Sequence, residues 1–251
     1  MSLMRLASKH LCLLLALLSV GCASVEGQGK LDIDPFETTN RRVSAFNDEL
    51  DRSLLKPVAT TYQKTVPGIV QDGVHNFFGN LSDMWSTANN ALQLKPMETA
   101  ETGLRTAVNT VFGIYGLIDW GTRVGLQRHN ADFGQTLGYW GVPSGPYVVL
   151  PVFGPSNVRD TAGLVVDSQE NQWSKVSPTT ARYSGTVLRV VDKRAEYLGL
   201  DRQLEEVALD KYAFIRDAYI QRRLAQTRRG KPAADDGDDN KDGGNNERFD
   251  Q

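Results

Sequence analysis

Apolar residues recur three or four positions apart through most of the chain beyond Ile33. This spacing is typical of helices that bury one face. The clearest stripes contain Val43, Phe46, Leu50 and Leu54; Ile69, Val70, Val74, Phe77 and Phe78; Met84, Trp85, Ala88, Ala91 and Leu92; and Leu104, Ala107, Val108, Val111, Phe112 and Tyr115. The pattern predicts a mainly α-helical domain whose helices must pack on one another or on lipid.

Proline and capping residues predict where the first helix begins and ends. It should begin at Asp34, because Pro35 at the first helical position and Glu37 three residues after the cap complete a capping box. Pro57 should end or kink this helix, since proline lacks the amide N–H that a helix interior needs. The phenylalanines of the stripes are our candidates for side chains that face the core or a membrane: Phe46, Phe77, Phe78 and Phe112.

The same signals divide the rest of the chain into helices. A second helix should start near Pro67 and break at Gly79-Asn80, and Pro96 should mark the next boundary. Three later helices are predicted: from Asn157 to Asp167 with Ser156 as N-cap, after Pro178, and from about Asp201 to Arg223.

A block rich in glycine and proline, from Asp132 to Asp160, interrupts the helical pattern. Glycine permits positive φ and proline fixes φ, so this block cannot be a long helix. Its apolar run from Tyr147 to Phe153 predicts a short edge strand or hairpin arm. Gly141 and Gly154 flank the run and are, with Tyr147, candidates for a segment that moves as a unit. The alternative is a structural plug.

Polar residues lie opposite the apolar stripe that begins at Leu104. Arg105 and Asn109 are the clearest of these and are candidate residues of a polar path. A helix of about sixteen residues is about 24 Å long, which is short of the roughly 30 Å core of a bilayer. Two arrangements remain open: a helical cluster with lipid outside and polar groups inside, or a soluble periplasmic bundle.

The chain begins with the pattern of a lipoprotein signal peptide. Arg5 and Lys9 precede an apolar run that is far shorter than the roughly 20 residues of a membrane span. Small residues then lead to Cys22 and resemble a lipobox, although Ser19 stands where leucine is usual. We predict that residues 1–21 are removed and that Cys22 carries the lipid. The alternative is an ordinary secretory signal with a chance cysteine.

Charge defines the remaining boundaries. The formal net charge is −2 for the whole chain, and loss of the two signal cations leaves −4. The segment from Lys231 carries that excess, so the body is balanced and no nucleic-acid partner is expected. We predict an anchor and linker over residues 22–33, one helical domain over residues 34–227, and a disordered acidic tail over residues 228–251.

The sequence has few of the groups that catalysis uses. After loss of the signal the only histidines are His75 and His129, and neither has metal-ligand spacing to another histidine or cysteine. Asp160 and Asp167 are seven residues apart, but Asp160 is better explained as the partner of Arg159 or another nearby cation. No enzyme activity, metal or cofactor is therefore predicted.

The Asp132–Asp160 block also carries a family resemblance. Together with Asp34-Pro35-Phe36-Glu37 through Phe46-Asn47-Asp48, and with Asn76-Phe77-Phe78-Gly79-Asn80-Leu81, it resembles the MlaA (VacJ) lipoproteins. The similarity extends from about Asp34 to about Trp173. It implies a Gram-negative outer-membrane lipoprotein, anchored from the periplasmic side.

The resemblance also implies a function. MlaA-like helices form a ring around an amphipathic channel. That channel takes phospholipid from the outer leaflet, passes it to a soluble periplasmic carrier of the Mla type and so maintains lipid asymmetry. Association with a trimeric porin is implied as well. The alternative is a scaffold lipoprotein with a soluble helical bundle.

Overall fold

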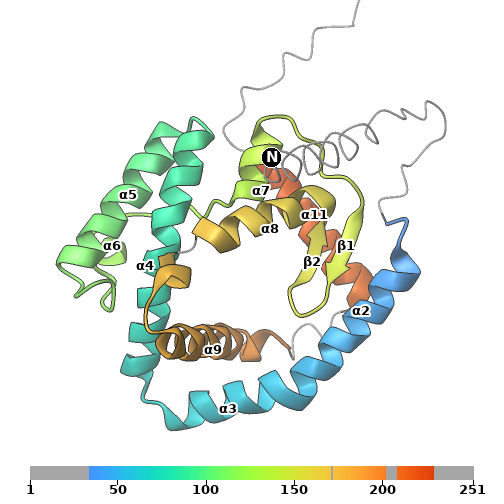
Figure 1. Ribbon diagram of the computed structural model, residues 1–251, viewed down its shortest axis with the longest axis horizontal. Helices are drawn as coiled ribbons and strands as arrows, with labels where there is room; N and C mark the ends of the chain where they lie inside the picture. Colours follow the sequence, from blue (N-terminus) through green and yellow to red (C-terminus); the bar gives the residue numbers. More distant parts are fainter. Residues whose placement is uncertain (1–33, 171, 202–207, 229–251) are drawn as a thin grey trace, which may run out of the picture. The chain divides into compact units, whose positions relative to one another are not determined.

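The computed structural model describes residues 34–228 except residue 171 and residues 202–207. Helices dominate, as predicted, and those of the described part follow one another around a ring (Figure 1). Helix α2 (Glu37–Leu50), a π-helical turn (Asp51–Leu55) and α3 (Lys56–Thr65) form one continuous arc, and α4 (Gly68–Leu92) continues it. Helices α5 (Pro96–Val111) and α6 (Trp120–Arg123) pack beside α4.

The glycine- and proline-rich block supplies a helix and a β-hairpin. Helix α7 (Phe133–Tyr139) precedes strands β1 (Tyr147–Leu150) and β2 (Gly154–Asn157), and α8 (Val158–Glu170) follows them. The strands are antiparallel, with Tyr147 opposite Asn157 and Leu150 opposite Gly154. The predicted hairpin is therefore confirmed. Strand β1 also packs against α2, and this contact closes the ring (Figure 1).

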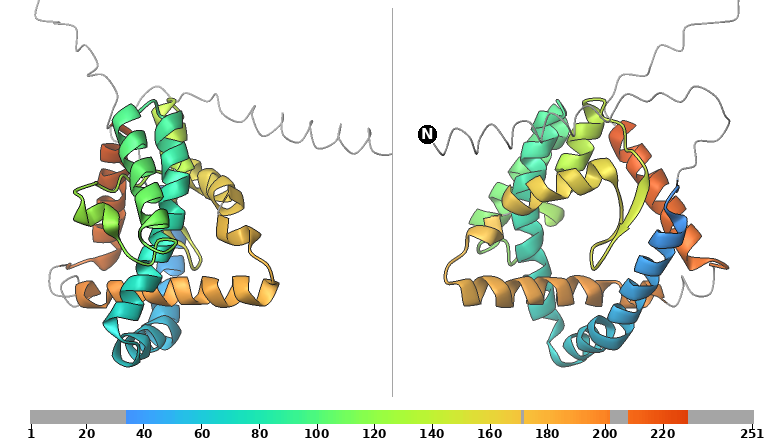
Figure 2. Two further views of the ribbon diagram at one scale, coloured as in Figure 1. Left: turned by 90° about the vertical axis from the view of Figure 1, so that its left-hand side faces the viewer. Right: turned by 45° about the vertical axis from the view of Figure 1, so that its right-hand side comes forward.

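The last described helices lie inside and beside this ring. A 3₁₀ turn (Gln172–Lys175) leads to α9 (Thr179–Glu196), which contacts α3 and α4 (Figure 2). Helix α11 (Lys211–Arg228) packs on α7 and β2. The predicted last helix, from Asp201 to Arg223, was wrong in its bounds: residues 208–210 are not helical, and the Asp210 side chain accepts a hydrogen bond from the Ala213 amide at the start of α11.

One of two predicted interruptions was wrong. Gly79-Asn80 does not break α4, which continues through both residues. The glycine instead makes room for a side chain: a Cβ placed there would lie 2.8 Å from a guanidinium nitrogen of Arg128. The boundary predicted at Pro57 is present: a π-helical turn separates α2 from α3, which begins at Lys56. Proline sits in the first turn of α3, where a missing amide N–H is tolerated, and the preceding turn becomes π-helical.

Two predicted caps were also wrong. Asp34 makes no capping bond; its carboxylate instead accepts hydrogen bonds from the side chains of Asn40 and Tyr212. Ser156 lies within β2, and the side chain of Asn157 accepts the bond from the Asp160 amide that begins α8. In both cases a long-range partner or a neighbouring residue competes successfully for the local bond.

Burial in this fold is inverted. Among the described residues, two small clusters of buried apolar side chains are found, one around Ala59, Val191 and Ala195 and the other around Tyr147, Val149 and Tyr212. Phe78 and Ala131 are buried outside these two clusters. The buried face of α4 is mostly polar and consists of Phe78, Asn80, Asp83, Ser86, Asn89 and Asn90. In α5 the side chain of Arg105 is 3% exposed, whereas Phe112 at the helix end is 68% exposed. The apolar stripe of α5 thus faces outward.

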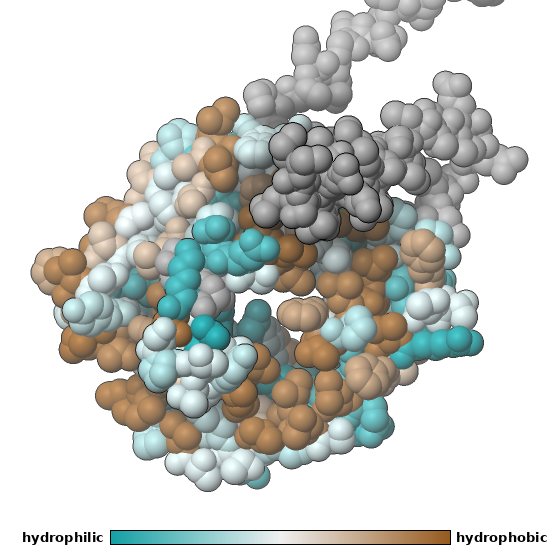
Figure 3. Space-filling view, in the orientation of Figure 1, coloured by the Kyte–Doolittle hydropathy of each residue, from teal (hydrophilic) through white to brown (hydrophobic). Residues whose placement is uncertain are grey.

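The outward apolar surface is extensive. Hydrophobic residues gather on the outer rim beside α5 and α6 and along the lower edge of the view in Figure 3. The exposed hydrophobic side chains of the described residues include Phe46, Leu54, Ile69, Leu104, Val111, Phe112 and Phe153. Monomeric soluble proteins seldom expose large contiguous apolar patches. Within the described residues, no helix combines the length and apolar character needed to cross a bilayer.

The predicted phenylalanines separate into an inner and an outer pair. Phe77 and Phe78 stack edge-on with each other and with Trp173, at ring-centroid separations of 5.2–6.1 Å. Phe46 and Phe112 are more than half exposed. The sequence stripe could not separate the two pairs, because both have the same spacing.

This difference predicts unequal effects of truncation. Phe78→Ala should lower the free energy of unfolding by about 3–5 kcal/mol, because it opens a cavity in the aromatic cluster. The matched variant Phe112→Ala should change it by no more than about 0.5 kcal/mol. Urea unfolding of the purified protein in non-ionic detergent measures both, and equal losses would contradict the assignment of Phe78 to the core.

Candidate functional site

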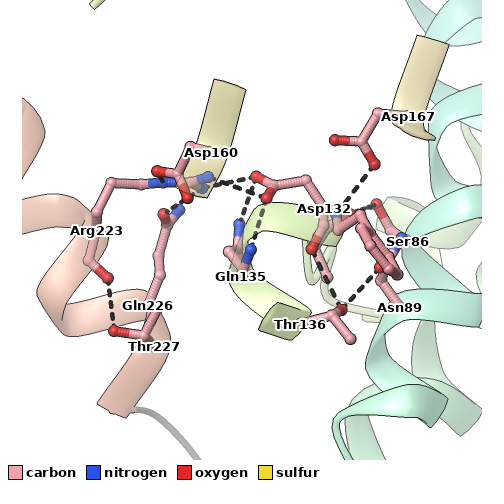
Figure 4. Close-up of polar contacts among 12 residues, drawn as sticks. Ser86, Asn89, Asp132, Gln135, Thr136, Asp160, Asp167, Arg223, Gln226 and Thr227 are labelled. Atoms are coloured by element: carbon pink, nitrogen blue, oxygen red, sulfur yellow. Dashed lines mark hydrogen bonds and ion pairs between the residues drawn. The ribbon is translucent and has the colours of Figure 1, made fainter. Parts of the chain in front are cut away.

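A buried charge network joins α11 to the centre of the fold (Figure 4). Arg223 donates from Nε to Asp160 Oδ2 at 2.6 Å and from its terminal nitrogens to both carboxylate oxygens of Asp132, at 2.6 and 3.0 Å. The sequence predicted a cation beside Asp160, and Arg159 also pairs with it at 2.8 Å. The paired side chains hold α11 against the starts of α7 and α8.

The charge network keeps the carboxylate of Asp160 ionised although that side chain is buried. Burial alone would raise the pKa of Asp160, but the hydrogen bond and charge of Arg223 outweigh it and lower that pKa below its ordinary value. The Tyr219 hydroxyl donates a further bond to the same carboxylate. A buried charge is tolerated when it is paired and hydrogen-bonded in this way.

The polar network continues from α7 to α4. Thr136 Oγ1 donates to Asn89 Oδ1 at 2.7 Å, and Ser86 exchanges hydrogen bonds with the backbone of Ala131 (Figure 4). Asp167 accepts from the Phe133 amide and from the indole N–H of Trp85. Polar side chains, rather than apolar ones, therefore make the contacts of α4 with α7 and α8 here.

A second charge cluster contains Arg105 and Asn109, the predicted polar-path residues. Arg105 lies 2.5 Å from Asp119 and 3.5 Å from Asp83, and Asn109 Oδ1 accepts from the Gly121 amide. Burial raises the pKa of Asp83, although the charges of Arg128 and Arg105 act in the opposite direction. Both predicted residues lie inside the contact between α4, α5 and α6, where they join these helices.

Two asparagines of α2 hold the outer edge of the hairpin. Asn40 donates to the Tyr147 carbonyl at 3.1 Å and accepts from the Val149 amide at 2.9 Å. Asn47 repeats the arrangement one heptad later, with the Leu150 carbonyl and the Val152 amide. Each side chain amide thus occupies the position of a neighbouring strand on an otherwise unpaired edge. Neither residue was predicted to have this role, although their seven-residue spacing places them on one helix face.

The candidate residues Gly141, Tyr147 and Gly154 lie in or beside the hairpin. The sequence predicted this segment to move as a unit, with the change in backbone angles absorbed at the two glycines. Gly141 has φ of +96° and Gly154 has φ of +81°, and a Cβ on either would meet no atom within 4 Å. Tyr147 is buried against Tyr212 and Tyr219, and burial raises its pKa to about 12. Gly141 precedes the hairpin and Gly154 lies at its turn, while Tyr147 anchors β1.

The ring is hollowed near its centre, between α4, α8, α9 and the hairpin (Figures 1 and 3). The predicted residues fall into two separate groups: Arg105 and Asn109 lie in the α4–α5–α6 contact, on the side of α4 away from the hollow, and the hairpin residues lie against α2 and α11 (Figure 1). Cys22 lies outside the described residues. No cluster that could hold a metal ion occurs in the part of the chain that the structure describes.

The amino-acid sequence is similar to that of known proteins. The sequence matches the family described as MlaA lipoprotein over residues 32–226. It is 35% identical over 213 residues to the "Intermembrane phospholipid transport system lipoprotein MlaA" of Escherichia coli, covering 82% of each chain. The protein of the same name in Haemophilus influenzae is 31% identical, with 87% of this chain and 90% of that one covered.

A solved structure gives the same relationship in three dimensions. It was reported as "Structural basis for maintenance of bacterial outer membrane lipid asymmetry" and is similar to this fold with a TM-score of 0.68 and 33% sequence identity. The match covers 77% of this chain and 98% of that chain. The resemblance carried by Asp132–Asp160 and the two flanking segments is therefore confirmed.

The charge network makes a pH-dependent prediction. Arg223→Met should lower the free energy of unfolding near neutral pH by about 3 kcal/mol or more, because Asp132 loses its arginine and the buried Asp160 keeps only Arg159. The lowered pKa of Asp160 means that ionised Asp160 stabilises the native protein fully above its ordinary pKa, and this contribution is lost as pH falls below that value and through the lowered pKa. The difference between variant and native protein should therefore be smaller at about pH 3 than at about pH 7.

Urea unfolding followed by circular dichroism at the two pH values measures this difference. The matched variant Arg222→Met removes an exposed cation from the same helix and should be nearly neutral. A loss at Arg223 that is independent of pH would contradict the role of the buried carboxylates.

Proposed function

This chain belongs to the MlaA lipoprotein family, and we propose that it removes mislocalised phospholipid from the outer leaflet of the outer membrane. In this proposal the lipid passes through an amphipathic channel within the helical ring, and its removal maintains lipid asymmetry. The observation that carries the proposal is the inverted burial of the helices, with Arg105 inside and Phe112 outside.

Inverted burial suits a protein that lies in lipid and encloses a polar path. A phospholipid has a charged head and apolar tails, so its path must provide polar groups for one and apolar surface for the other. Polar groups at membrane depth must be shielded from lipid by protein. The polar inner contacts of α4, the outward apolar stripe of α5 and the central hollow together support such a path (Figure 3).

The mode of membrane attachment is part of the proposal. We propose that acylated Cys22 anchors the chain from the periplasmic side and that the exposed Phe46 and Phe112 enter the lipid. Each buried methylene of an acyl chain contributes about 0.8 kcal/mol, so multiple chains at Cys22 would hold the protein firmly. The ring then lies in the membrane without any single helix crossing it.

Two partners complete the proposal. The names of the relatives place them in an intermembrane transport system. Such a system needs a carrier through the aqueous periplasm, so we propose that a soluble carrier of the Mla type receives the lipid. A trimeric porin is proposed as the membrane partner on family resemblance alone. We propose no catalytic reaction, and any energy for directional flow must come from a partner.

The hairpin is proposed as the element that controls the path. Its outer edge is held by Asn40 and Asn47, and two glycines with positive φ lie before it and at its turn. A conformational change absorbed at Gly141 and Gly154 would move the apolar residues of β1 relative to α2. The buried Tyr147 would remain the fixed point of the strand.

Leaflet-specific labelling of phospholipid in a deletion strain tests the function. Phospholipid should accumulate in the outer leaflet without release of fatty acid, and the native chain should restore asymmetry. A Cys22→Ala chain should fail to restore it, because the anchor is lost. Intact asymmetry in the deletion strain, with disturbed envelope attachment, would contradict transport and favour a scaffold.

Replacing the two hairpin glycines tests the gate. The double variant Gly141→Val, Gly154→Val should fold and reach the outer membrane but alter the amount of outer-leaflet phospholipid, because valine strongly disfavours positive φ. Gly125→Val is the matched control, since Gly125 also has positive φ (+84°) and open space around it but lies outside the hairpin. Wild-type asymmetry in the double variant would rule out the gate.

A further inference from the structure

Arg189 of α9 is held in an unusual environment. One terminal nitrogen donates to Ser82 Oγ of α4 at 2.9 Å, and the guanidinium carbon lies 5.7 Å from the centre of the Phe78 ring. The side chain is half-buried. A guanidinium group has five N–H donors, so one bond to a hydroxyl leaves most of its capacity for another acceptor.

Several other arginines of the fold that are partly or fully buried lie beside carboxylates. Examples are Arg105 with Asp119, Arg128 with Asp83, Arg159 and Arg223 with Asp160, Arg194 with Asp51, and Arg216 with Asp34. Among the described residues, which are 34–228 without 171 and 202–207, no carboxylate forms an ion pair with Arg189. Burial lowers the pKa of Arg189, and no nearby carboxylate offsets this effect.

The surroundings fix the direction of this side chain. Gly185 lies one helical turn before Arg189 and therefore on the same face of α9. That face packs tightly on Trp173: a Cβ placed on Gly185 would lie 1.9 Å from the indole ring. Trp173 in turn packs on Phe77 and Phe78. The aromatic cluster thus restricts rotation of α9 and keeps Arg189 between α4 and α9, two of the helices that border the central hollow (Figure 1).

We propose that Arg189 binds the phosphate of a phospholipid during its passage through the ring. A phosphodiester supplies the anionic oxygens that a guanidinium group binds through paired hydrogen bonds. This inference rests on the proposed function and adds to it a residue that distinguishes phospholipids from uncharged lipids.

Binding of short-chain lipids to the full mature protein in non-ionic detergent tests the inference. Isothermal titration should use dihexanoyl-phosphatidylglycerol, the phosphate-free analogue dihexanoylglycerol, and inorganic phosphate. Arg189→Gln should weaken binding of the phospholipid by about tenfold or more, because a charge-assisted contact is lost. Arg189→Lys should retain part of the affinity, and Lys193→Gln, which removes an exposed cation from the same helix, should retain all of it.

Three results would overturn the inference. They are native affinity in Arg189→Gln, an equal loss for dihexanoylglycerol, which would indicate a structural role, and an Arg189-dependent site that takes inorganic phosphate but not the phospholipid. Restoration of lipid asymmetry in the deletion strain separates this inference from the proposed function. If Arg189→Gln restores asymmetry as fully as the native chain, only the inference fails. If the native chain itself restores nothing, the proposed function fails.

Discussion

The pairing of buried charges is the constraint on which this fold depends. Asp83 and Asp160 are almost fully buried, and each lies within ion-pair distance of two arginines. Removing one partner from such a group is far more costly than losing a surface ion pair, because the remaining charge stays desolvated. The two clusters therefore determine how α4, α5 and α6 assemble, and how α7, α8 and α11 do.

Polar contacts inside leave the apolar side chains outside. In water this arrangement would expose more apolar surface than a folded monomer normally tolerates. In a bilayer it is favourable, because lipid covers the outer face while paired polar groups remain shielded. The inverted helices, the hairpin closing the ring at α2, and the central hollow thus form one account of a lipid path (Figures 1 and 3).

Much of the secondary structure could be predicted from the sequence, but its orientation could not. Periodicity identified the stripe of α5, yet a stripe has the same spacing whether it faces a core or lipid. The helix break predicted at Gly79 is absent, and the glycine instead accommodates Arg128, a residue about fifty positions away. The hairpin clamp by Asn40 and Asn47 and the network of Arg223 likewise depend on contacts between distant segments, which local patterns do not contain.

The central claim is that the outward apolar face lies in lipid, and spin-label accessibility tests it most directly. Labels attached at Phe46→Cys and Phe112→Cys in the protein, reconstituted in phospholipid vesicles, would be compared with a label at the exposed Asp72→Cys. The account predicts that the first two labels collide mainly with dissolved oxygen and the third with a water-soluble nickel chelate. Nickel accessibility at Phe46 and Phe112 equal to that at Asp72 would contradict it.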